Sequence, residues 1–85
     1  SREDLQNLLN IAVYKKDLWA AVDIYLKLTE LEPDNPRFHS GLAAAYAEAG
    51  DSAGAIAAAK RAMELDPEFV AEGQMFINNL SRTKK

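Results

Sequence analysis

The chain carries few side chains whose chemistry could serve catalysis, and His39 is the first to consider. It is the one histidine of the sequence, and no cysteine is present to act as a nucleophile or to form a disulfide framework. A histidine that acts as a base needs an orienting partner, and no Ser/His/Asp arrangement accompanies His39. We interpret His39 as a packing or half-exposed surface residue. The sequence therefore predicts no catalytic residues and no enzyme.

The carboxylates and glycines are spaced for structure rather than for ligands. Asp17, Asp51 and Asp66 stand where helices are predicted to begin, and a carboxylate there caps backbone N–H groups and complements the helix dipole. Their spacing matches neither a pair of catalytic carboxylates nor a calcium loop. The four glycines are scattered and form no phosphate-binding motif. We therefore expect no metal site and no cofactor.

Length and charge exclude further classes of protein. The 85 residues allow one small domain or a part of a larger array. Ten basic and thirteen acidic residues give a net charge of -3, which does not suit a nucleic-acid partner. The longest apolar runs, 42–47 and 53–59, are far shorter than the roughly 18 residues that cross a bilayer. The lack of cysteine fits a soluble protein of the cytoplasm or of a bacterial periplasm, so the compartment stays open.

The spacing of apolar residues predicts five helices joined by short turns, with no room for strands. We expect helices at about residues 3–15, 18–31, 36–49, 51–65 and 68–81. Asn35 is a good N-cap and Pro36 a good first residue for the third helix. Gly50 is expected to end that helix in a left-handed conformation. Lys15 and Lys16 close the first helix, where positive charge is favourable.

The chain repeats itself with a period of 34 residues. Sliding the sequence by that distance superposes six identical pairs: Leu8 on Leu42, Asp17 on Asp51, Ala21 on Ala55, Glu30 on Glu64, Leu31 on Leu65 and Pro33 on Pro67. A register of this kind, at a period between 20 and 50 residues, indicates an array of stacked supersecondary units.

Residues 36–69 resemble a tetratricopeptide repeat. The family pattern places large, Leu, small and Tyr residues on a first helix, then alanines on a second helix and a closing Pro. The matching residues are His39, Leu42, Ala43, Tyr46, Gly50, Asp51, Ala55, Ala59, Ala62 and Pro67. Residues 2–35 match more loosely, because Ala12 replaces the consensus Tyr and Lys16 replaces the turn glycine.

The resemblance implies an all-α, right-handed solenoid of helical hairpins over the whole chain. We expect a single domain over residues 1–85, made of a repeat at 2–35, a second repeat at 36–69, a capping helix at 70–81 and a frayed tail at 82–85. One hairpin cannot bury its apolar face alone, so stacked neighbours form a continuous core. Phe76, Ile77 and Leu80 of the capping helix should cover the alanine-rich fourth helix and the third helix.

The resemblance also implies a scaffold for protein–protein interaction in which the first helix of each repeat lines a concave groove for a peptide or a partner helix. The residues placed there by register are Gln6, Asn10, Val13, Tyr14, Arg37, Ser40, Ala44, Ala47, Glu48, Gln74, Asn78 and Arg82. Some members of the family clamp a C-terminal carboxylate on these helices. Here Asn10 is retained, but the other clamp positions hold Gln6, Gly41, Ala71 and Met75. We therefore expect no binding of such tails.

Trp19 and Leu26 form a second apolar stripe on the second helix, beside its core-facing side. The equivalent residues of the next repeat are Ala53 and Lys60, so these large side chains exceed what the fold requires. An exposed patch with a tryptophan suggests a convex contact, for which a symmetric homodimer is the commonest form. Local packing of Trp19 over the end of the first helix is the alternative.

Two further functions stay open: a self-association module, and an interaction tail of a larger protein, such as one of bacterial envelope glycan assembly.

Overall fold

A computed structural model describes residues 1–83 and contains five α-helices and no strand within that range. The elements are α1 (Arg2–Lys15), α2 (Leu18–Leu31), α3 (Pro36–Glu48), α4 (Ser52–Leu65), the short 3₁₀ helix η1 (Pro67–Phe69) and α5 (Val70–Thr83). The all-α helical-repeat fold is confirmed. The last helix differs in detail from the expectation, because the chain turns through η1 before α5 and stays helical through residues 82 and 83. Residues 84–85 of the expected tail lie outside the described residues.

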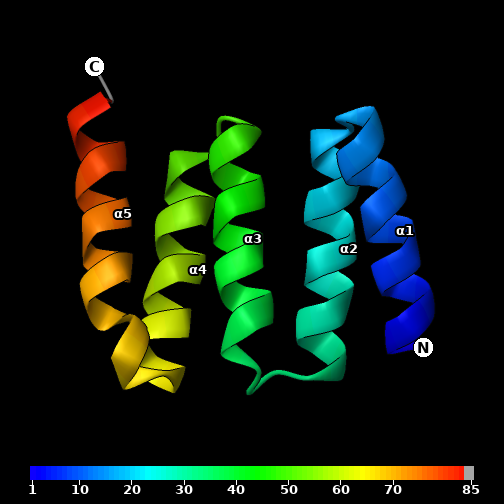
Figure 1. Ribbon diagram of the computed structural model, residues 1–85. Helices are drawn as coiled ribbons and strands as arrows, with labels where there is room; N and C mark the ends of the chain where they lie inside the picture. The colour runs from blue at the N-terminus through cyan, green and yellow to red at the C-terminus, as the bar shows by residue number, and fades with distance from the viewer. Residues whose placement is uncertain (84–85) are drawn as a thin grey trace.

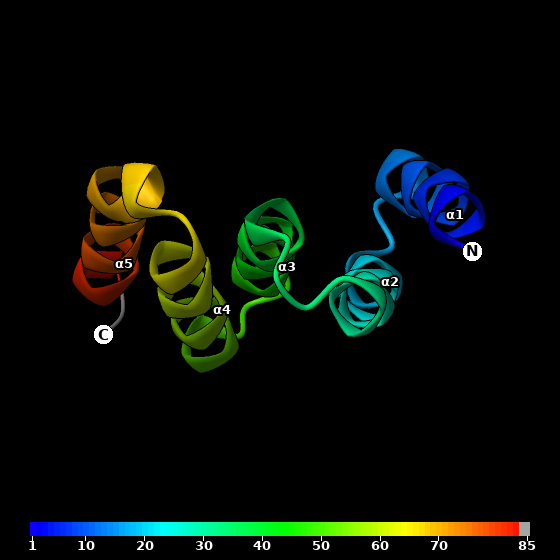
Figure 2. The same ribbon diagram turned by 90° about the horizontal axis from the view of Figure 1, so that it is seen from below.

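The helices stand side by side in a row, and each runs antiparallel to the next along the chain (Figure 1). Seen along the helices, the row is a zigzag in which α1, α3 and α5 lie on one side and α2 and α4 on the other (Figure 2). The principal extents are 34 × 28 × 16 Å. Two hairpins of equivalent helices, followed by α5, thus reproduce the 34-residue period. No helix of the described chain is long and apolar enough to cross a bilayer.

Local capping interactions set the helix boundaries. The Asp17 carboxylate accepts a hydrogen bond from the Ala20 N–H at 3.2 Å, and the Asp51 carboxylate accepts one from the Gly54 N–H at 2.9 Å. Asn35 caps α3 in the same manner, with Pro36 as the first helical residue. The predicted caps are therefore confirmed. They could be predicted because each one depends only on residues two or three positions away.

The turns within the two hairpins have the same geometry but different residues. Gly50 adopts a φ of 89°, and Lys16 at the equivalent position adopts a φ of 57°, the one positive φ of a described non-glycine residue. In both turns the residue that follows donates its backbone N–H to a carbonyl oxygen of the preceding helix. Asp17 donates to Ala12 and Asp51 donates to Tyr46, each at 2.9 Å. Lys16 therefore occupies a left-handed conformation that glycine adopts without strain.

The core runs along the row between the helices. Leu28 and Val22 of α2 are almost fully buried, and α4 contributes a stripe of fully buried small residues, namely Ala55, Ala59 and Ala62. Small side chains on this stripe let the neighbouring helices approach closely. Gly41 plays the same part on α3, because a Cβ there would overlap the ring of Tyr25 on α2. Burial also raises the pKa of the Tyr25 phenol.

Helix α5 closes the far end of this core. Phe76 and Ile77 are partly buried and pack against the core cluster, and the helix that α5 mainly contacts is α4. Leu80 is also partly buried. The face of α5 toward α4 is therefore structural, whereas Met75 remains 65% exposed.

Candidate protein-interaction surface

The helices predicted to line the groove, α1, α3 and α5, do lie on one side of the row (Figure 2). Most of the residues predicted for the groove are exposed, namely Gln6, Asn10, Val13, Tyr14, Arg37, Ala44, Glu48, Gln74, Asn78 and Arg82, whereas Ser40 and Ala47 are partly buried. Exposure makes these side chains available to a partner. Two clefts bring some of them together.

The larger cleft, which we call the α1–α3 cleft, has a volume of about 480 Å³. It is lined by Val13, Lys16, Leu18, Ala21 and Glu48, which come from α1, the following turn, α2 and α3. Three of these side chains are aliphatic, and the two charged ones have opposite signs. The cleft can therefore receive an apolar side chain and place charged or polar groups of a ligand beside Lys16 and Glu48.

The smaller cleft, the α3–α5 cleft, has a volume of about 240 Å³. It is lined by Pro36, Arg37, Ser40, Asp66, Phe69 and Glu72. The Ser40 hydroxyl donates a hydrogen bond to the Arg37 carbonyl oxygen at 3.0 Å, so its proton is already engaged. The mixture of one cation and two carboxylates around Phe69 favours neither a strongly acidic nor a strongly basic ligand.

The remaining predicted groove residues line neither cleft. Gln74 and Asn78 lie one turn apart on α5, where the Gln74 amide donates to the Asn78 amide oxygen at 3.1 Å. Tyr14 is 89% exposed at the end of α1. These side chains can reach a ligand that lies along the helices, but the structure does not join them into one pocket.

The clefts also contain residues that the groove register missed. Leu18 and Ala21 form part of the α1–α3 cleft, although their spacing on α2 is that of core residues. Asp66 and Phe69 enter the α3–α5 cleft from η1 and the turn before it. The 34-residue register identifies first-helix positions only, so it carries no signal for cleft residues from second helices and turns.

Trp19 and Leu26, the predicted convex pair, are both partly covered by neighbours. The Trp19 ring meets Tyr46 of α3 edge to face, with centroids 6.4 Å apart and an interplanar angle of 74°. Tyr46 in turn lies close to Gly54 of α4. Trp19 is nevertheless 53% exposed, and Leu26 is 37% exposed. The Trp19 ring thus forms a contact between the first hairpin and the second, and about half of its surface faces solvent.

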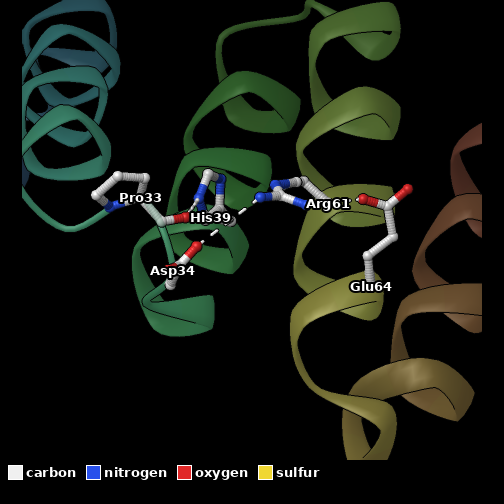
Figure 3. Close-up of polar contacts among 5 residues, drawn as sticks. All are labelled: Pro33, Asp34, His39, Arg61 and Glu64. Atoms are coloured by element: carbon white, nitrogen blue, oxygen red, sulfur yellow. Dashed lines mark hydrogen bonds and ion pairs between the residues drawn. The ribbon is translucent and has the colours of Figure 1, made fainter.

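His39 has a structural contact in the turn between the hairpins (Figure 3). Its Nε2 lies 2.8 Å from the Pro33 carbonyl oxygen. Because a carbonyl oxygen only accepts hydrogen bonds, Nε2 carries the proton and donates it.

On the neighbouring α4, Arg61 pairs with Asp34 at 4.0 Å and with Glu64 at 3.0 Å. Among the residues that the structure describes, no cluster of three His, Asp or Glu side chains could hold a metal ion.

Comparison with known proteins agrees with this architecture. A family model described as tetratricopeptide repeat matches residues 12–80. The chain is 40% identical over 67 residues to the small glutamine-rich tetratricopeptide repeat-containing protein 2 of Mycosarcoma maydis. That match covers 79% of this chain but only 19% of the length of the relative.

Proposed function

The chain belongs to the tetratricopeptide-repeat family, and from this premise we propose that it holds an extended segment of a partner protein against α1, α3 and α5. The family supports a role in protein–protein interaction, and its members are generally scaffolds without catalytic activity. The observation that carries the specific proposal is the α1–α3 cleft, an aliphatic depression of about 480 Å³ between two first helices. We propose no catalytic role for any residue.

The ligand that suits this surface is a peptide with an aliphatic side chain and little net charge. Val13 and Leu18 would contact the aliphatic group, while Lys16 and Glu48 flank it with opposite charges. Gln6 and Asn10 are exposed on α1, and each amide offers a donor and an acceptor to a peptide backbone. Tyr14 is the expected anchor beside the cleft, because aromatic side chains with a polar tip are frequent hot spots. A groove of two repeats is short, so a micromolar Kd, about -8 kcal/mol, is the natural scale.

The same surface is not suited to the carboxylate clamp found in some members of the family. One clamp position is Gly41, where even a Cβ would overlap the Tyr25 ring. The positions at Ala71 and Met75 provide no cation. We therefore propose that an internal segment of a partner, rather than a C-terminal carboxylate, occupies the groove.

A screen of a peptide library against the full chain tests this proposal, with selected peptides titrated by isothermal calorimetry. Val13→Asp and Tyr14→Ala should each weaken binding by at least about tenfold, since hot-spot truncations cost roughly 2 kcal/mol or more. Ile11→Asp is the matched control, because Ile11 is 51% exposed and Val13 is 60% exposed on the same helix, but Ile11 does not line the cleft. Peptides that bind all variants equally well would show that the groove is not the binding site.

For the domain organisation we propose two repeats, 2–35 and 36–69, capped by a helix that begins at residue 70. The observation in favour is that the turn hydrogen bonds of Asp17 and Asp51 are equivalent at a 34-residue distance. Limited proteolysis should cleave the turn between the two repeats no faster than the whole domain unfolds, since α2 and α3 share one core. Rapid cleavage near Pro33 would contradict a single domain.

Self-association through Trp19 and Leu26 remains a second proposal, supported by the 53% exposure of the one tryptophan. The double variant Trp19→Ala, Leu26→Lys should then abolish any dimer while helix content stays intact. Trp19 also packs on Tyr46, so the double variant removes a contact of the fold as well. Leu26→Lys alone is therefore the control, because it leaves that ring contact in place. A dimer that survives both variants would exclude the convex patch. The further alternative, a tail of a larger protein, stays a prediction.

A further inference from the structure

The two clefts share one helix, α3, and open on the same side of it. Glu48 of α3 lines the α1–α3 cleft, whereas Arg37 and Ser40 line the α3–α5 cleft. Residues 40, 44 and 48 follow one another at spacings of four, which places them in one row along a helix. Figure 2 shows α3 between α1 and α5 on one side of the row of helices. A single ligand that lies along α3 can therefore reach both clefts.

The surface of α3 between the two clefts consists of small side chains. Ala44 is exposed midway between Ser40 and Glu48, and Ala47 beside it is partly buried. An extended chain can lie against these methyl groups without displacing a larger side chain. Ser40 and Glu48 are separated by about 12 Å along the helix axis, and Arg37 and Glu48 by about 16 Å. At about 3.3 Å per residue, an extended chain covers this distance with four or five residues.

The α3–α5 cleft suits a basic side chain. The Ser40 hydroxyl donates its proton to the Arg37 carbonyl oxygen, so towards a ligand the Ser40 oxygen can only accept. The carboxylates of Asp66 and Glu72 are acceptors as well, and within residues 1–83 neither forms an ion pair. Phe69 adds an aromatic ring, and such rings attract cations over their faces. Three acceptors and a ring together favour an ammonium or guanidinium group.

Arg37 limits this cleft to one basic group. Its side chain is exposed, and within residues 1–83 its guanidinium forms no ion pair. A second cation beside the first would be repelled by Arg37, whereas an acidic or polar neighbour would not. The cleft therefore selects a single basic residue within a segment of little net charge, which agrees with the ligand proposed above.

We propose that the partner segment carries two anchors: an aliphatic residue for the α1–α3 cleft, and a lysine or arginine about four or five positions away for the α3–α5 cleft. This inference rests on the proposed function and specifies the partner that the groove takes. The aliphatic anchor contacts Val13 and Leu18, and the basic anchor lies beside Phe69 and Glu72. Linked anchors bind together only when the linker spans their sites, so the spacing itself determines the affinity.

A spacing series tests the distance between the anchors. Peptides that the library screen selects should share an aliphatic and a basic residue at the proposed spacing. Removing two residues between the anchors of one such peptide shortens its reach by about 7 Å, so only one anchor can then be seated. The Kd of the shortened peptide, measured by isothermal calorimetry with the full chain, should rise to that of a peptide with alanine in place of the basic residue.

A charge reversal in the cleft tests the chemistry of the second anchor. Glu72→Lys should raise the Kd of the selected peptide by about fivefold, because a repulsion replaces an ion pair at an exposed site. A peptide with glutamate in place of its basic residue should recover that loss on the Glu72→Lys variant. Glu68→Lys is the matched control, because Glu68 is also exposed and the charge change is the same, but Glu68 does not line the cleft. This control should leave the Kd unchanged.

The outcomes distinguish this inference from the proposed function. Binding that Val13→Asp weakens, but that Glu72→Lys and the shortened spacing leave unchanged, would retain the groove and overturn the second anchor. Selected peptides without the paired residues, or an equal loss of affinity with Glu68→Lys and Glu72→Lys, would overturn it as well. A screen that selects no peptide, or binding that no cleft variant affects, would contradict the proposed function and this inference with it.

Discussion

Replacing Lys16 by glycine should stabilise the domain, because Lys16 holds the left-handed turn that Gly50 forms in the next hairpin. Lys16 has φ 57° and ψ 37°. This conformation costs a non-glycine residue about 1–2 kcal/mol. Glycine removes the strain, but its freedom in the unfolded chain offsets about 0.4–1 kcal/mol, and the lost charge near the helix C-terminus offsets about 0.3 kcal/mol. We therefore expect Lys16→Gly to raise the free energy of unfolding by about 0.5 kcal/mol, or the Tm by about 2–4 °C.

The reverse change at the equivalent turn is the matched control. Beyond its two chain neighbours, no residue has an atom within 4 Å of a Cβ built at Gly50, so Gly50→Ala adds backbone strain without a tertiary clash. We expect Gly50→Ala to lower the free energy of unfolding by about 1 kcal/mol. Urea titrations and thermal melts followed by far-UV circular dichroism measure both variants. If Lys16→Gly is destabilising, or if Gly50→Ala has no effect, backbone strain is not what distinguishes the two turns.

Three further predictions concern packing and titration. Gly41→Ala should lower the free energy of unfolding by about 1–3 kcal/mol in urea, because its Cβ would overlap the Tyr25 ring; an equal loss in a Tyr25→Ala background would exclude that contact as the cause. Phe76→Ala should cost about 2 kcal/mol, below the 3–5 kcal/mol of a fully buried phenylalanine, because the ring is only partly buried; an unchanged thermal melt would place α5 outside the cooperative core. Because burial raises the pKa of Tyr25, the folded state holds the phenol proton more tightly than the unfolded chain. The stability present below about pH 10 should therefore fall as the pH rises through the folded pKa, and melts of Tyr25→Phe over the same pH series should show a smaller decline.

Local chemistry made the helices predictable from sequence. An N-cap such as Asp17 or Asp51 accepts a hydrogen bond from an N–H three residues away, and a turn glycine such as Gly50 is favoured by its own positive φ. These interactions involve only neighbours along the chain. The 34-residue period then indicated how the hairpins stack. The start of the last helix was less predictable, because Asp66 and Pro67 begin a 3₁₀ turn at 67–69 and the α-helix itself begins only at Val70.

The clefts depended on tertiary structure. Leu18 and Ala21 have the spacing of core residues on α2, yet they line the α1–α3 cleft, because α1 and α3 lie on the same side of the row with α2 between them. Trp19 has the spacing of a surface residue on the same helix, yet its ring reaches Tyr46 of the next hairpin. Neither outcome follows from the periodicity of one helix, since each is set by the angle and distance between separate helices.

Leu8 and Leu42 show the division between sequence and tertiary structure within one pair. They are identical residues at the same position of successive repeats, and the sequence determined that each lies on the packing side of a first helix. Leu42 is 7% exposed and Leu8 is 52% exposed. The difference arises because α2 covers α3 on that side and no described helix covers α1. Periodicity determines which way a side chain points, but burial is decided by whatever stands opposite it.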